Sequence, residues 1–150
     1  MIQETILSKT VIVPPHKLHV YKEYVERQVR ELEGKNYSNE IGYIYRVLEI
    51  IKIENQAIVK NNFSGNIIYK ATFLVENCNP EIGEAIDCSI VQNTNITLAS
   101  KNPLKIIIIS EPGLPKLEKD DKVNVEILCK EINHGAKYIK VVGRFISKLN

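Results

Sequence analysis

The sequence lacks tryptophan and contains one methionine, three cysteines and seven glycines among its 150 residues. The cysteines, Cys78, Cys88 and Cys129, are odd in number and show no Cys-x-x-Cys spacing, which argues against a disulfide framework or a cysteine-rich metal site. The glycines occur one at a time, so there is no phosphate-binding glycine loop, and there is no HExxH motif and no serine elbow. We therefore expect no catalytic centre, no cofactor and no metal ion.

Long hydrophobic runs and a strong charge of one sign are also absent. No apolar segment is long enough for a signal peptide or a membrane span, so we expect a protein of the nucleus or cytoplasm without a membrane partner. The 20 basic and 18 acidic residues give a net charge of +2. Such a balance argues against nucleic-acid binding by overall charge, so any RNA contact must come from a local patch.

Two strand-like runs dominate residues 41–75. One face of the first run, read at a period of two, carries Ile41, Tyr43, Tyr45, Val47, Ile51 and Ile53. Its opposite face is also largely apolar, so we expect this strand to be covered on both sides. The second run, residues 67–75, alternates as well, and the turn-rich segment 61–66 before it predicts an antiparallel pair.

The residues before this pair predict a strand and a helix. Ile2 to Val13 is rich in apolar residues and is ended by Pro14 and Pro15, which cannot continue a strand ladder. Apolar residues then recur at helical spacing, at Leu18, Tyr21, Val25, Val29 and Leu32, and Gly34 follows where a left-handed cap is favoured. We expect an amphipathic helix lying on a sheet.

The composition changes at the polar stretch that ends in Pro80, and we place a domain boundary there, giving domains 1–79 and 80–150. Downstream, five strands are predicted: Glu84 to Val91, Thr94 to Ala99, Leu104 to Ser110, Lys122 to Ile132 and Lys137 to Ile146. Five short strands in about 70 residues fit a small OB-type barrel. The predicted fold class is therefore α+β. The four consecutive isoleucines 106–109 could serve an interface with a partner protein, but we assign them to the barrel core.

The last predicted strand carries the one set of residues suited to nucleic acid. Tyr138, Lys140, Arg144 and Lys148 fall at even positions and hence on one side, opposite apolar residues that can enter the barrel. Cations beside an aromatic on a small barrel suit single-stranded RNA. Lys101 and Lys105, which flank the turn into the third barrel strand, are secondary candidates. Against RNA binding, Val142 and Ile146 share that face, and no second exposed aromatic residue is predicted in the barrel to extend a stacking platform.

Three short stretches occur in a fixed order along the chain. They are Ile41-Gly42-Tyr43-Ile44 with Val47-Leu48, the run Ile67 to Phe73, and the run Pro80 to Asp87. In this order the chain resembles the stalk subunit of multi-subunit DNA-directed RNA polymerases, the seventh-largest subunit of eukaryotic polymerase II and its archaeal counterpart. The resemblance implies a truncated ribonucleoprotein-like domain over residues 1–79 and an S1-type OB barrel over residues 80–150.

The resemblance also implies how such a protein works. The family docks on the polymerase core near the clamp through the tip between the paired strands, which makes Val59, Asn62, Phe63 and Asn66 candidate docking residues. A tight turn with Phe63 packed into its own sheet is the alternative. The barrel of the family lies near the exiting RNA. The subunit has no active site of its own and usually pairs with a smaller helical protein related to the fourth polymerase subunit, although a polymerase without that partner is an alternative.

This chain departs from the family in two ways. Its barrel is short, and Asn95-Ile96 stands where many S1 barrels have a glycine followed by an aromatic residue. RNA binding is therefore the family property that the sequence supports least. The compact, lysine-, isoleucine- and asparagine-rich chain suits a large DNA virus or a parasite with its own polymerase. The rival interpretation is a free-standing S1-type RNA-binding protein of translation or RNA decay.

Overall fold

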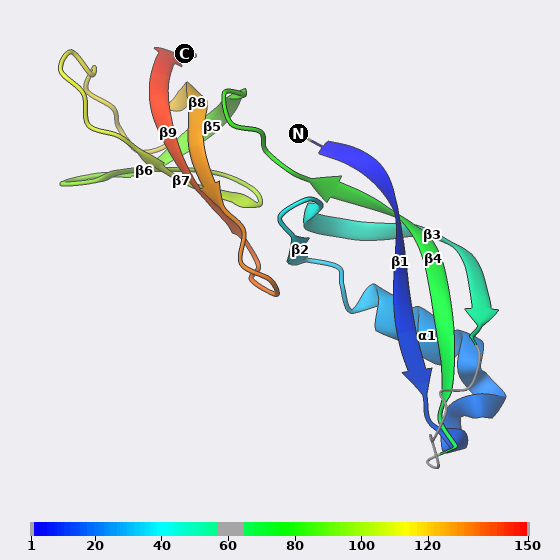
Figure 1. Cartoon of the computed structure of the whole chain (residues 1–150). Helices are drawn as coiled ribbons and strands as arrows, with labels where there is room; N and C mark the ends of the chain where they lie inside the picture. The colour runs from blue at the N-terminus through cyan, green and yellow to red at the C-terminus, as the bar shows by residue number, and fades with distance from the viewer. Residues whose placement is uncertain (1, 57–64, 150) are drawn as a thin grey trace. The chain divides into compact units, whose positions relative to one another are not determined.

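The computed structural model describes residues 2–56 and 65–149, and its contacts divide them into two compact units. The first, the sheet unit, consists of residues 2–34 and 44–77. The second, the barrel unit, contains residues 78–149 together with residues 35–43, which sequence reasoning placed in the N-terminal domain. Figure 1 shows the order of the elements along the chain.

The first four strands form one sheet with the order β1-β4-β3-β2. β1 spans Ile2–Val13, β2 Lys35–Ser38, β3 Gly42–Asn55 and β4 Ile67–Cys78. The ends of β1 are those predicted from the sequence. The short strand β2 was not predicted, because four residues with one apolar side chain carry little periodic signal.

The expected helix begins as a 3-10 helix, Pro15–Val20, and becomes α-helical only over α1, Tyr21–Arg30. The hydroxyphenyl rings of Tyr21 and Tyr69 stack with centroids 4.7 Å apart, and Val25 and Val29 are fully buried. Gly34 has the predicted left-handed backbone, with φ of 76°. Its N–H donates to the Ile44 carbonyl oxygen, 2.8 Å away, which turns the chain back toward the sheet.

Burial in the sheet unit alternates along β4 and at the end of β1. Val11, Val13, Tyr69, Ala71, Phe73 and Val75 are buried. In β3, both sides are covered only near its start, at Gly42, Tyr43 and Ile44, and beyond Val47 no residue of the strand is buried. The expectation that β3 is covered on both sides is therefore wrong for its second half.

Gly42 is required at the start of β3 by both backbone and space. Its φ is +81°, and a Cβ atom there would overlap the carbonyl oxygen of Cys78. The glycine at position 42 thus allows the backbone there to lie close to Cys78 and Asn79, where the chain leads into the barrel.

The five predicted downstream strands all exist and close into a barrel with the order β5-β6-β7-β9-β8. They are β5 Ala85–Asn93, β6 Thr97–Lys101, β7 Leu104–Ile108, β8 Lys122–Glu131 and β9 Ile139–Lys148. β7 and β9 pair in parallel, and the other pairs are antiparallel. The architecture is that of an OB-like barrel.

The barrel core is built from alternate residues of every strand. Its largest fully buried side chains are Ile90, Leu104, Ile106, Ile127, Ile139 and Val123. Ile107 is 47% exposed, so the assignment of four consecutive isoleucines to the core is wrong: β7 obeys the two-residue period, with Ile106 and Ile108 inside.

The long connection between β7 and β8 is fastened to the barrel. Leu117 is buried, and its carbonyl oxygen accepts a hydrogen bond of 2.6 Å from the Asn93 side-chain amide. The Asp120 N–H donates to the Ile90 carbonyl oxygen, and the Ile90 N–H donates to that of Asp121. These bonds hold the second part of the connection against β5.

Candidate functional site

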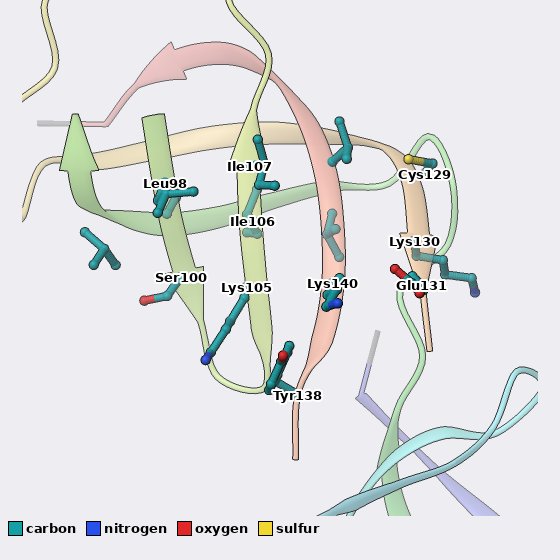
Figure 2. Close-up of a pocket in the computed structure, with 14 residues that line it drawn as sticks. Leu98, Ser100, Lys105, Ile106, Ile107, Cys129, Lys130, Glu131, Tyr138 and Lys140 are labelled. Carbon is teal, nitrogen blue, oxygen red and sulfur yellow. The ribbon is translucent and has the colours of Figure 1, made fainter. Parts of the chain in front are cut away.

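A hollow of about 720 Å³ lies on the outside of the barrel over β6, β7 and β9 and the end of β8. We call it the barrel groove, and Figure 2 shows the side chains that line it. Its floor is mainly aliphatic, with Leu98, Ile107 and Val142 from three neighbouring strands and Val91 from β5. Three lysines, Lys105, Lys130 and Lys140, also line it.

The parallel pairing of β7 with β9 places Lys105 directly opposite Lys140. The Lys105 ammonium lies over the ring of Tyr138, 4.1 Å from its centroid, and Figure 2 shows both side chains at the same end of the groove. A cation over an aromatic face is attracted by the ring quadrupole, so this contact fixes both side chains at one end of the groove. The structure thereby brings together three of the residues singled out in the sequence: Lys105, Tyr138 and Lys140.

Asn36 holds the loop that precedes Tyr138. The Asn36 side-chain amide donates to the carbonyl oxygens of Tyr138, at 2.8 Å, and Asn133, at 3.1 Å. Its backbone N–H donates to the Ala136 carbonyl oxygen, and its own carbonyl accepts from Gly135. Asn36 is buried, so these bonds are shielded from water and define where the chain enters β9.

The other predicted cations lie away from the groove lining. Arg144 pairs with Glu111 at 3.0 Å, and the Lys148 ammonium lies 3.3 Å from an Asp121 carboxylate oxygen. Lys101 lines a separate hollow of about 350 Å³. Tyr138 lies just before β9, and within the strand Lys140 and Arg144 share the exposed face, as the alternation predicts. They meet different neighbours because they lie at different points along the strand, and Arg144 is next to Glu111.

Of the aliphatic floor, sequence reasoning placed Val142 on the face of Lys140 but assigned Ile107 to the core. The signal was present: strict alternation from Leu104 makes Ile107 an outward residue beside Lys105. The run of isoleucines obscured this alternation, because a strand buried on both faces and a strand with an apolar outer face contain the same residue types.

Within residues 2–56 and 65–149, no three histidine, cysteine or acidic side chains cluster as metal ligands. No helix in the same residues is long and apolar enough to cross a membrane. Burial raises the pKa of the Cys88 thiol to about 11, with a further contribution from the Asp87 carboxylate, so this thiol stays protonated and unreactive near neutrality. Cys129, by contrast, is exposed in the groove.

Three of the four predicted docking residues, Val59, Asn62 and Phe63, lie outside the described residues. Asn66 immediately precedes β4. Beside it, Gly65 has φ of +75°, and a Cβ atom there would lie 3.0 Å from Cγ of Pro15. The chain that enters β4 thus passes closely over the start of the 3-10 helix.

No model of a known protein family matches the chain. The chain is 28% identical over 111 residues to a protein of Acanthamoeba polyphaga mimivirus described as a putative DNA-directed RNA polymerase subunit. The match covers 74% of this chain and 50% of the mimivirus protein, so the chain spans about half the length of the curated relative it matches. The chain is therefore similar to a protein described as a subunit of an RNA polymerase, and the match does not say which subunit.

Proposed function

We propose that the chain is a non-catalytic subunit of a DNA-directed RNA polymerase, and specifically a stalk subunit. The similarity to the mimivirus protein carries the first part of the proposal. The second part is supported by the order of the elements, in which a sheet with a long β3–β4 pair is followed by a closed five-stranded barrel of OB type. The barrel is proposed to be of the S1 type.

In this proposal the residues between β3 and β4 dock on the polymerase core near the clamp, through Val59, Asn62, Phe63 and Asn66. The barrel then lies near the exiting transcript. Lys140, Lys101 and Lys105 lend weak contacts to single-stranded RNA, which weaken with salt because each contact releases counterions. Arg144 and Lys148 contribute less, since each already neutralises a carboxylate. The site of action is wherever the polymerase works: nucleus, cytoplasm, a viral transcription compartment or the virion.

The test is affinity purification of the tagged chain from its native source, with mass spectrometry of the proteins that accompany it. We expect the large polymerase subunits, and we expect Phe63→Asp to remove them while the chain stays folded by circular dichroism. Ile82→Asp is the matched control, because Ile82 is also a large apolar residue, is exposed, and lies outside the tip. Recovery of the polymerase with both variants would refute docking through the tip.

The second candidate is a free-standing S1-type RNA-binding protein. The observation that favours it is the set of Lys105, Tyr138 and Lys140 at one end of the barrel groove. Such a protein should co-purify with ribosomal or decay proteins, or with RNA alone. It should also be indifferent to Phe63→Asp and lose activity when Lys140 and Arg144 are neutralised.

A further inference from the structure

The floor of the barrel groove is a continuous aliphatic row. Leu98 of β6 lies directly across from Ile107 of β7, and Ile107 lies directly across from Val142 of β9. Val91 sits at the irregularity in the β5–β6 pairing and joins the same lining. Single exposed aliphatic residues are ordinary on protein surfaces, whereas this set is contiguous and lies in a hollow, as in grooves that bind apolar side chains.

The charge in the lining of the groove is mainly positive, with Lys105, Lys130 and Lys140 against Glu131. Among the described residues, neither Lys105 nor Lys140 forms an ion pair with a carboxylate, and both lie at the end of the groove that holds Tyr138. Lys130 is not available in the same way, because its ammonium donates to the Asn79 side-chain oxygen and the Pro80 carbonyl oxygen, both at 2.7 Å. Glu131, the carboxylate of the lining, lies directly across from Lys140 in the β8–β9 pairing and offsets part of its charge. Three lysines against one carboxylate still leave an excess of positive charge, which favours an occupant with negative charge.

The lining favours a polypeptide over a nucleic acid. Single-stranded nucleic acid binds such barrels by stacking bases on aromatic faces. The groove offers one aromatic residue, Tyr138, and one face of its ring is already covered by the Lys105 ammonium. The rest of the floor is branched aliphatic side chains, which match leucine, isoleucine and valine better than they match bases.

We propose that the barrel groove binds a short acidic, aliphatic segment of a partner protein. Its branched side chains pack on Leu98, Ile107 and Val142, and its aspartate or glutamate side chains pair with Lys105 and Lys140. The proposal depends on the barrel alone and not on the polymerase assignment. Because it uses Lys105 and Lys140, a bound segment would compete with the RNA contacts proposed for these two lysines.

The experiment is selection of short peptides from a random display library on the full chain. The Ile107→Glu variant serves for counter-selection. We expect enriched peptides that combine Leu, Ile or Val with Asp or Glu. Binding of one such peptide, measured by fluorescence anisotropy, should weaken at least about tenfold in Ile107→Glu and in Lys140→Glu.

Two variants control for unspecific effects of added charge. Ile146 lies on β9 outside the groove lining and is 49% exposed, close to the 47% of Ile107, so Ile146→Glu should leave peptide affinity unchanged. Lys119→Glu, in the exposed part of the β7–β8 connection, is the matched control for Lys140→Glu. All four substituted positions are exposed, so all four variants should fold.

Cys129 provides an independent readout, since it is exposed in the groove while Cys78 and Cys88 are buried. The selected peptide should slow the reaction of Cys129 with a thiol reagent such as Ellman's reagent. The proposal is overturned if no acidic, aliphatic peptides are enriched, or if their binding is equal in Ile107→Glu and Ile146→Glu. It is also overturned if labelled oligouridylate, rather than peptide, protects Cys129 from the reagent and if Ile107→Glu abolishes the binding of that oligonucleotide.

Discussion

The sheet unit and the barrel unit use alternating strands in different ways. In the sheet unit, Phe73 and Tyr69 lie on the buried face, where Tyr69 stacks on Tyr21 of the helix, while Ile6 and Ile12 of β1 remain exposed. In the barrel unit, closure gives every strand an inside, and a single layer of alternate residues forms the core. A sheet needs a second element to bury one face, whereas a barrel covers its inner face with its own strands.

This difference concerns function as well as stability. The outward-facing side chains of the barrel do not contribute to its core, so they can be apolar or polar without changing the packing inside. At Leu98, Ile107 and Val142 they are apolar and form the floor of the groove. Cations on the same outer surface either pair with carboxylates, as Arg144 does, or remain available, as Lys140 does.

The largest expected effect is in the sheet unit. Phe73 is completely buried, so Phe73→Ala should lower the free energy of unfolding by about 3–5 kcal/mol, through lost apolar burial and the cavity left behind. Urea denaturation measures the loss, and hydrogen exchange locates it in β1, β3, β4 and α1. The control Ile12→Ala, at an exposed position, should change stability by no more than about 0.5 kcal/mol. A loss below that for Phe73→Ala would contradict the assigned core.

The next effect tests how tightly the barrel closes. A Cβ atom on Gly143 would overlap Cγ1 of Val125 and lie 3.1 Å from the Glu126 carbonyl oxygen. Gly143→Val should therefore destabilise the chain by about 1–3 kcal/mol or more, because rigid neighbours must shift. Differential scanning calorimetry should show a lower melting temperature. Ser147→Val, at an exposed position on the same strand, is the comparison, and equal effects of the two changes would refute tight packing at Gly143.

A smaller effect comes from the Cys88 thiol inside the barrel. Burial raises its pKa in the folded state to about 11, above its ordinary value, so the unfolded chain loses this proton first as the pH rises. Stability from this group is complete below the ordinary cysteine pKa and is lost as the pH rises toward about 11. Between about pH 8 and pH 10 the wild type should lose about 1 kcal/mol more than Cys88→Ala. Parallel urea titrations at the two pH values would contradict this if both proteins lost stability equally.

The smallest effect concerns the ion pair of Arg144 with Glu111, whose side chains are 49% and 37% exposed. Water screens such a pair, so a double-mutant cycle with Arg144→Ala and Glu111→Ala should give a coupling of about 0.2–1 kcal/mol. The coupling should shrink further in high salt. A coupling of several kcal/mol would mean that surface charge, rather than closure, holds this side of the barrel.

Much of the fold was predictable from sequence because its signals are local. The ends of β1 follow from alternation and Pro14, the left-handed Gly34 follows from the end of a helical pattern, and the five barrel strands follow from turn residues between apolar runs. The short β2 was not predictable, because its residues pair with the sheet and hold the β8–β9 loop through contacts that leave no periodic pattern.

The sequence by itself determined which residues alternate, where the chain turns and which residue types could meet RNA or a partner. Only the tertiary structure decided that β3 is covered along part of its length and that Ile107 points outward. It also decided that Lys105, Tyr138 and Lys140 gather at one groove while Arg144 and Lys148 are paired elsewhere. The physical reason is that cover and pairing depend on residues distant in the chain: Asn36 bonds Tyr138 across 102 positions, and barrel closure decides which neighbours each cation meets.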